Sequence, residues 1–280
     1  MKTIFFAFFL LFSVVSEAQY YYNDIIGAAT LRDRMKDYTT NRVRSVTATG
    51  YDERGVKSSD FSEWQEVDAA AGILKVTSRN GQQIVRQQYQ FDRQFNITSL
   101  TETSGTIKST TVYSYDGKNN IISIKTTSTD SLNDFNETDE HQWSYNANGR
   151  PQGLLRVLNG HDSSEYRLNT DEKGNVIDEK LYRRNRAIDS VLYYYNEINN
   201  LTDIVRFDKK ANKLIPDVMF EYDDNNHVIQ RLTILATTPR PDYLIWRYMY
   251  DDKGLKTKEA MFGKMKQLKG RIDYVYSFNP

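Results

Sequence analysis

The chain contains no cysteine among its 280 residues. This absence excludes disulfide bonds, thiolate catalysis and cysteine metal sites. It also excludes a lipid-modified N-terminal cysteine, so the chain is not expected to be a lipoprotein. A protein exported without disulfides is held together by its core alone, and this chain is long enough to bury a substantial one.

The chain also lacks an excess of charge of either sign, because 37 basic residues balance 37 acidic ones. Proteins that bind nucleic acids neutralise phosphates with a basic surface. We therefore expect no nucleic-acid partner, and the composition gives no support to a polybasic membrane patch.

Long apolar runs are absent after the first 18 residues. Within them, Lys2 supplies a positive start, Ile4 to Val15 form an apolar run broken by one serine, and Ser16-Glu17-Ala18 places small residues before Gln19. This pattern is typical of a secretory signal peptide. The apolar run reaches about 18 Å as a helix, short of the ~30 Å hydrocarbon core. We predict that residues 1–18 are removed, that the mature chain starts at Gln19, and that it is secreted across the inner membrane to the periplasm or cell surface, with no transmembrane helix.

Residues 19–40 differ in pattern from the rest of the chain. Apolar residues recur there at spacings of three and four, which predicts a helix from about residue 24 to about residue 38: Ile25, Ala28, Leu31, Met35 and Tyr38. Asn23 or Asp24 is suited to cap its start. We expect this helical cap to cover an unpaired edge strand of a sheet; the alternative is a partner-binding helix.

A turn signature dominates residues 41–280, in which Asp or Asn is followed three residues later by Gly or Asn. The Asp side chain bonds its own backbone two residues on, and Gly and Asn suit the left-handed conformation. The predicted left-handed turn residues are Gly55, Asn119, Gly149, Gly174, Asn199, Asn226 and Gly254. A further copy at Asp92 has Phe95 in place of Gly or Asn, and Asn96 is expected to take over its role.

Pairs of aromatic residues precede most of these turns, separated by one residue. Strand side chains alternate, so both rings of a pair lie on one face. The clearest pairs are Tyr113/Tyr115, Trp143/Tyr145, Tyr193/Tyr195, Phe220/Tyr222 and Tyr248/Tyr250. Two interpretations are open: an exposed row that binds sugars or an extended peptide, or a cross-strand ladder inside the fold. Recurrence at equivalent positions favours the ladder.

The second aromatic residue of a pair falls at positions 91, 115, 145, 195, 222, 250 and 276. The one gap of 50 contains a degenerate copy, marked by Asp171–Gly174, that divides it into two of 25, so the period is near 26 residues. Each unit has room for two strands and two turns. A sheet of so many strands twists and curls. We therefore predict an all-β fold: an antiparallel meander of about eight two-strand repeats, coiled into one curved sheet, with a short N-terminal helix.

The motif Tyr-x-Tyr-Asp-x-x-Gly followed by a strand resembles the YD repeats of RHS-type secreted bacterial proteins. The resemblance is carried best by Tyr113–Ile124, Tyr193–Ile204, Phe220–Ile229 and Tyr248–Leu255, and weaker copies extend it over residues 45–280. It implies a secreted or surface protein built from successive antiparallel hairpins. RHS proteins are far longer and often enclose a toxin domain, so this chain looks more like small secreted YD-repeat-like proteins of unknown function.

Motifs that carry chemistry are missing. The sequence has no nucleophile elbow, glycine-rich phosphate loop or HExxH stretch. Its three histidines, His141, His161 and His227, lie far apart in polar or turn settings and are expected on the surface. The acidic turns Asp223–Asn226 and Asp251–Asp252 lack the ligand spacing of a calcium loop. We predict no catalytic, cofactor-binding or metal-binding residues.

These observations favour a secreted, non-enzymatic scaffold or binding protein of the bacterial cell envelope, whose partner is an envelope protein or a polysaccharide. One alternative is a glycan-processing enzyme whose paired carboxylates carry no sequence mark. Another is an outer-membrane β-barrel, suggested by tyrosine-rich alternating strands and the near-terminal Phe278. Charges on both faces of Val176–Leu181 and Leu255–Glu259 oppose a lipid-facing wall.

Overall fold

The structure of the chain is a computed structural model that describes residues 20–208, 212–235 and 242–280. The predicted signal peptide, residues 1–18, and the predicted new N-terminus at Gln19 lie outside the described residues.

One helix, α1 (Asn23–Thr40), precedes the strands. The strands are β1 (Val43–Asp52), β2 (Lys57–Asp68), β3 (Ile73–Asn80), β4 (Gln83–Phe91), β5 (Ile97–Ser104), β6 (Ile107–Tyr115), β7 (Ile121–Asp130), β8 (Phe135–Tyr145), β9 (Pro151–Leu158), β10 (Asp162–Thr170), β11 (Val176–Arg183), β12 (Arg186–Tyr195), β13 (Leu201–Asp208), β14 (Lys213–Tyr222), β15 (Val228–Leu235), β16 (Asp242–Tyr250), β17 (Lys256–Phe262) and β18 (Leu268–Phe278).

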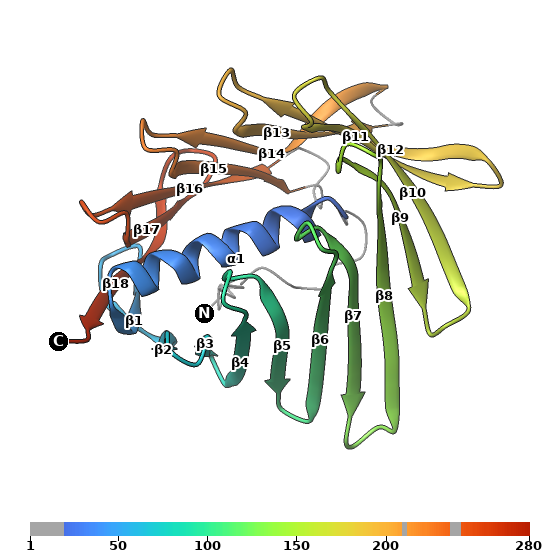
Figure 1. Ribbon diagram of the computed structural model, residues 1–280. Helices are drawn as coiled ribbons and strands as arrows, with labels where there is room; N and C mark the ends of the chain where they lie inside the picture. The colour runs from blue at the N-terminus through green and yellow to red at the C-terminus, as the bar shows by residue number, and fades with distance from the viewer. Residues whose placement is uncertain (1–19, 209–211, 236–241) are drawn as a thin grey trace.

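The strands form a closed barrel (Figure 1). Each strand pairs antiparallel with the next, and β18 pairs back with β1, so that Val46 lies opposite Tyr276. The predicted all-β antiparallel meander with an N-terminal helix is confirmed. The predicted curved sheet, coiled on itself, needs one correction: it closes into a barrel and keeps no free edge, because twist accumulated over 18 strands brings the two edge strands together and lets their backbone groups pair.

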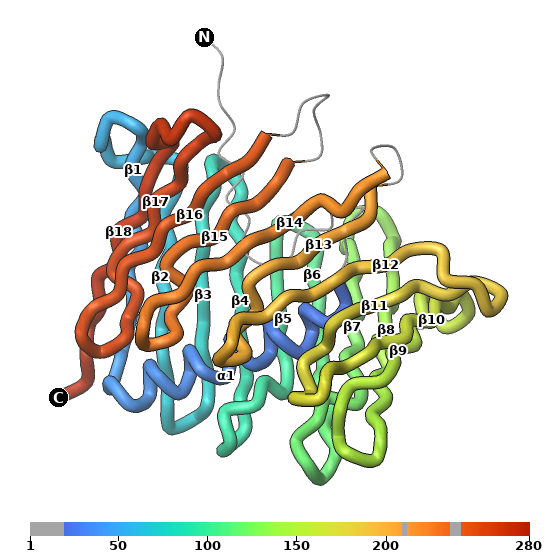
Figure 2. Tube along the Cα trace, turned by 90° about the horizontal axis from the view of Figure 1, so that it is seen from above, coloured from blue at the N-terminus to red at the C-terminus, as the bar shows by residue number. Residues whose placement is uncertain are grey.

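Helix α1 lies inside the barrel and crosses it near one end (Figures 1 and 2). The predicted helix is confirmed, but its expected position over an unpaired edge strand is wrong, since β1 and β18 pair with each other. Met35 and Tyr38 are buried, and the rest of the predicted apolar stripe packs against the same core. Helix α1 is not apolar enough over a sufficient length to cross a membrane, and the described residues contain no other helix.

The turns between even- and odd-numbered strands lie at the end of the barrel that α1 crosses. In the turn after β6, the Asn119 N–H donates to the Asp116 carbonyl (3.1 Å), and the Asp116 N–H donates to the Asn120 carbonyl (2.9 Å). The Asp116 carboxylate also accepts from the Lys118 N–H at 2.8 Å. This is a tight turn with a left-handed residue, and it leaves a bulge in the β6–β7 pairing.

All seven predicted turn residues have a left-handed backbone, with φ from 64° to 94°. Gly55 has the same conformation as the other six but lies at the opposite end of the barrel, in the turn that joins β1 to β2. In the copy at Asp92, Phe95 itself adopts the left-handed conformation, with φ 64°. The expectation that Asn96 takes over this role is therefore wrong. A turn from Gly263 to Lys266 (φ 59°) was not predicted, since it has neither Asp at its first position nor Gly at its last.

The left-handed turns can be tested at Gly149, where an added Cβ would meet nothing within 4 Å. Gly149→Val should cost on the order of 1–3 kcal/mol, because a β-branched residue is strained at positive φ. Gly149→Asn should cost much less, since other repeats already carry Asn there. Chemical denaturation of both variants measures the difference, and equal stability would contradict the turn assignment. Gly254 is a poorer choice, because its added Cβ would lie 3.1 Å from His227 Nε2.

Candidate functional site

The aromatic pairs lie on the inner face of the barrel. The first residue of a pair is buried in three cases: Tyr113, Trp143 and Tyr193. The others are partly buried: Tyr115, Tyr145, Tyr195, Phe220, Tyr222, Tyr248 and Tyr250. The pairs of β6, β8 and β12 belong to the core cluster that also contains the helix residues. None of these ten residues is therefore part of an exposed binding row.

The second tyrosine of each pair makes the same hydrogen bond in repeat after repeat. Its hydroxyl donates to a backbone carbonyl in the strand immediately before its own. The acceptor is always the first residue of that strand. The bonds are Tyr115 to Ile97 (2.8 Å), Tyr145 to Ile121 (2.9 Å), Tyr195 to Val176 (2.9 Å), Tyr222 to Leu201 (2.7 Å) and Tyr250 to Val228 (3.0 Å). A further pair on β18, Tyr274/Tyr276, repeats the pattern, with Tyr276 donating to Lys256 (2.8 Å). A phenylalanine has no hydroxyl to donate, which explains why tyrosine recurs at this position.

Two neighbouring tyrosines on β12 allow a matched test of this bond. Tyr195→Phe should lower the free energy of unfolding by about 1–2 kcal/mol, because it removes a partly buried hydroxyl that donates to the Val176 carbonyl and also contacts the Tyr22 hydroxyl. Tyr194 points outward and is 46% exposed, so Tyr194→Phe should change stability by less than about 0.5 kcal/mol. Urea denaturation of both variants decides the point, and equal losses would show that the inward hydroxyl adds nothing.

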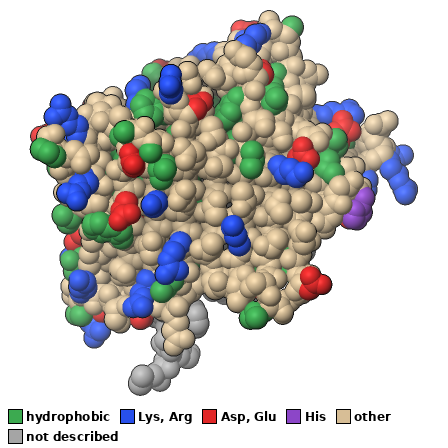
Figure 3. All heavy atoms as spheres, turned by 60° about the horizontal axis from the view of Figure 1, so that its bottom comes forward, with side chains coloured by type: hydrophobic (Ala, Val, Ile, Leu, Met, Phe, Trp, Pro, Cys, Tyr) green, Lys and Arg blue, Asp and Glu red, His purple; other side chains and the backbone are tan. Residues whose placement is uncertain are grey.

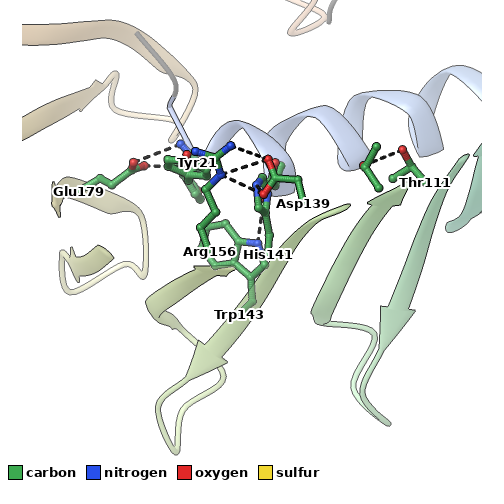
Figure 4. Close-up of polar contacts among 10 residues, drawn as sticks. Tyr21, Thr111, Asp139, His141, Trp143, Arg156 and Glu179 are labelled. Atoms are coloured by element: carbon green, nitrogen blue, oxygen red, sulfur yellow. Dashed lines mark hydrogen bonds and ion pairs between the residues drawn. The ribbon is translucent and has the colours of Figure 1, made fainter. Parts of the chain in front are cut away.

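A polar cluster holds the N-terminal end of α1 against β8, β9 and β11 (Figure 4). We call it the helix anchor; it comprises Tyr21, Asp24, Asp139, His141, Trp143, Arg156 and Glu179. Asp24 Oδ2 lies 2.7 Å from His141 Nδ1 and accepts from Trp143 Nε1 at 3.1 Å. Asn23 or Asp24 was expected to cap the helix, but the N-cap residue is Tyr22, and the Asp24 carboxylate contacts the barrel wall.

The other side of His141 faces a second carboxylate. His141 Nε2 lies 3.5 Å from Asp139 Oδ1, close enough for charge attraction. Arg156 binds Asp139 with two nitrogens, Nη2 at 2.7 Å and Nε at 2.9 Å. Burial opposes the charged form of His141, but the carboxylates of Asp139 and Asp24, which face its two ring nitrogens, outweigh burial and raise the pKa of His141 to about 9. Burial also opposes charge on Asp139, yet His141 and Arg156 lower its pKa to about 2.

Glu179 of β11 caps the helix from a different part of the chain. The N-cap residue Tyr22 makes no side-chain capping bond. Instead the Glu179 carboxylate accepts from the N–H groups of Tyr21 (3.1 Å) and Tyr22 (2.9 Å), and from the Tyr193 hydroxyl (2.9 Å). A negative charge beside a helix N-terminus is favourable, and the free N–H groups there need acceptors. Burial is the largest influence on this carboxyl and raises the pKa of Glu179 above its ordinary value.

The segment before the helix is held in the same way. The Tyr20 hydroxyl donates to Asp217, and the Arg206 guanidinium lies 4.6 Å from the Tyr20 ring centroid. Arg206 Nε is 2.7 Å from Asp217 Oδ2. At the far end of α1, the Tyr38 hydroxyl donates to Gln65 Oε1 at 3.0 Å. Both ends of the helix are thus fixed to the wall by polar contacts.

The histidines do not all lie where the sequence placed them. His141 is buried, so its expected surface position is wrong; it stands two residues before Trp143 and therefore shares the inward face. That parity was visible in the sequence and could have identified it. His161 is exposed, and His227 is partly exposed in its turn, stacked on Tyr250.

The helix anchor has little capacity for catalysis. A general base needs a ring nitrogen free to take a proton from a nucleophile or water. Both nitrogens of His141 face carboxylates. In the described ranges, no group of three or more histidine, aspartate or glutamate side chains is arranged to hold a metal ion. The geometry is that of a clamp between the helix and the wall.

The anchor makes stability depend on pH. The pKa of His141 rises from an ordinary 6.5 to about 9 in the fold, so its charge stabilises fully below pH 6.5 and progressively less as pH rises through 9. The pKa of Asp139 falls to about 2, so its contribution is lost only as pH falls toward that value. His141→Gln should lower stability by on the order of 3 kcal/mol at pH 6 and should remove the alkaline decline between pH 6.5 and 9.

The matched control for that prediction is His161→Gln, since the His161 side chain is 71% exposed. Its pH profile should keep the wild-type slope. Unfolding curves recorded from pH 5 to pH 10 give both profiles. A wild-type decline that survives in His141→Gln would contradict the assignment to this residue.

Comparison with known proteins gives a likeness to solved structures at low sequence identity. No family model matches the chain, and no curated protein matches it significantly. The chain is similar to the solved structure of a porin-like protein from Bacteroides uniformis, with 8% identity, a TM-score of 0.44, and coverage of 84% of this chain and 98% of that one. A porin-like protein from Bacteroides vulgatus has 14% identity, a TM-score of 0.32, and coverage of 85% and 99%.

The structure of the Photorhabdus luminescens Tc holotoxin pore has 12% identity and a TM-score of 0.33. It covers 88% of this chain, whereas this chain spans 17% of that one. Likeness at this level assigns no function to the chain.

Proposed function

We propose that this chain is an exported, non-enzymatic scaffold of the bacterial cell envelope, built on YD-type repeats, that binds an envelope protein or a polysaccharide through the outer wall of its barrel. The observation that carries the proposal is the use made of the ionisable side chains of the helix anchor and of Arg206 and Asp217 beside it. They pair with one another and with the N-terminal segment instead of lining an open site.

Each cationic side chain of these interior pairs lies against an acidic one. His141 and Arg156 face Asp24 and Asp139, while Arg206 faces Asp217. Glycosidases need two carboxylates placed on either side of a bond, one of them free to donate a proton. The carboxylates of Asp24, Asp139 and Asp217 are each in contact with a cationic side chain, which favours a structural role over a hydrolytic one.

The outer wall favours contact with water and with polar partners. Exposed charged side chains point outward from seven different strands: Glu66, Lys75, Lys108, Lys125, Arg167, Glu221 and Arg247. Figure 3 shows apolar, basic and acidic side chains interspersed on one face. A wall that faces lipid carries an uninterrupted outward apolar band, so this distribution does not favour the outer-membrane alternative.

Retention of envelope components tests the proposal. The full mature chain, immobilised through a C-terminal tag, is incubated with detergent extract of the native envelope and with purified cell-surface polysaccharide. A scaffold should retain a specific protein or polysaccharide, and a retained polysaccharide should keep its original chain length. Shortened chains would favour the hydrolase instead, and the absence of any retained component would contradict a binding role.

A further inference from the structure

The outer wall contains a groove over β18, β1 and β2, with a volume of about 510 Å³. The side chains that shape it include Arg44, Ser45, Thr47, Trp64, Glu66 and Ser277. A volume of this size is within the range of small-ligand sites. The groove is on the outer face of the barrel, whereas the helix anchor lies inside it, and the two share no residue.

Strand register builds the groove as two parallel rows. Thr47 of β1 lies between Val275 of β18 and Trp64 of β2. Two residues away, Ser45 lies between Ser277 and Glu66. Side chains directly opposite one another on the same face of a sheet are neighbours, so each row presents three adjacent side chains.

Trp64 gives the groove a flat apolar surface. It is 44% exposed, whereas Trp143 and Trp246, the other two tryptophans, are 5% and 8% exposed. The Trp64 Nε1–H donates to Glu66 Oε1 at 3.2 Å. This bond fixes the indole, so its face is presented to a ligand without further ordering of the side chain.

The floor and rim of the groove are polar. Ser45 points outward but is only 8% exposed, and its hydroxyl lies 2.6 Å from that of Ser277. Hydroxyls both donate and accept hydrogen bonds. At the rim, the exposed Arg44 offers donors and the exposed Glu66 offers acceptors. Because their charges are opposite, the groove carries no net charge from these two residues.

We propose that this groove binds a neutral saccharide. The C–H face of a sugar ring stacks on the Trp64 indole, and the hydroxyls at the ring edge bond to Glu66, Arg44 and the serine pair. An apolar face beside a few fixed polar groups suits a ligand that is apolar on one face and polar at its edge. The inference rests on the proposed binding function and makes it specific, since it selects polysaccharide over protein.

The backbone beneath the groove argues against an extended peptide. Peptides that bind sheets commonly add a strand at an unpaired edge, where main-chain hydrogen bonds supply affinity. β1 is paired on both sides, with β18 and β2, and those two strands pair in turn with β17 and β3. The groove therefore offers side chains but no free strand edge.

Tryptophan fluorescence provides a direct test, since Trp64 is the only exposed tryptophan of the three. The probes are cellohexaose, maltohexaose, mannohexaose and chitohexaose. At least one should bind by calorimetry and should reduce acrylamide quenching. Trp64→Ala should weaken that binding by about tenfold, because stacking on the ring is lost, while Trp64→Phe should retain part of it.

The matched control is Phe207→Ala, which removes a ring of equal exposure, 44%, from β13 on another part of the wall. It should bind as the wild type does. If a hexasaccharide binds wild type and Trp64→Ala equally well, this site assignment is overturned while the scaffold function stands. If no hexasaccharide binds, but an envelope protein is retained and is lost in Trp64→Ala, the saccharide class is overturned. If wild type retains nothing at all, the proposed function itself fails.

Discussion

The pairing of β18 with β1 is the constraint on which the rest of the structure depends. Closure removes both sheet edges, but a ring of 18 strands encloses more room than its wall side chains fill. The chain fills one end of that room with its own N-terminal helix and with the inward aromatic rows. The helix is thus part of the core, and the barrel and its contents stabilise each other.

Putting a helix inside a barrel raises the question of what fixes its position. Apolar packing alone is non-directional, so a helix surrounded by aromatic side chains could slide or turn about its axis. The carboxylates of Asp24 and Glu179 fix the position of the helix, because each has specific partners and a buried charge without a partner is costly. We infer that the helix anchor selects one orientation of α1, and that the aromatic residues around it supply most of the burial energy.

Local features of the fold could be predicted from the sequence, and global ones could not. Turn residues such as Asn119 follow from backbone preferences within four residues, and the inward position of Tyr113 follows from alternation and recurrence. Closure depends instead on the summed twist of all the strands, which no single repeat encodes. The place of α1 depends on closure, and so it was missed as well. The sequence does not mark Trp64 as a binding residue, because it belongs to no aromatic pair. Only the strand register places it beside Thr47 and in line with Val275.

Closure also sets the order of events during folding. Val46 and Tyr276 are near opposite ends of the chain, yet they face each other in the sheet. Pairing between residues so distant in sequence is entropically costly and slow. Until β18 is available, β1 has an unpaired side and α1 lacks the strands that surround it. Helix α1 and β1 are synthesised before the other strands, yet they are among the last elements to be fully enclosed. Unpaired strand edges remain open to other chains throughout that interval.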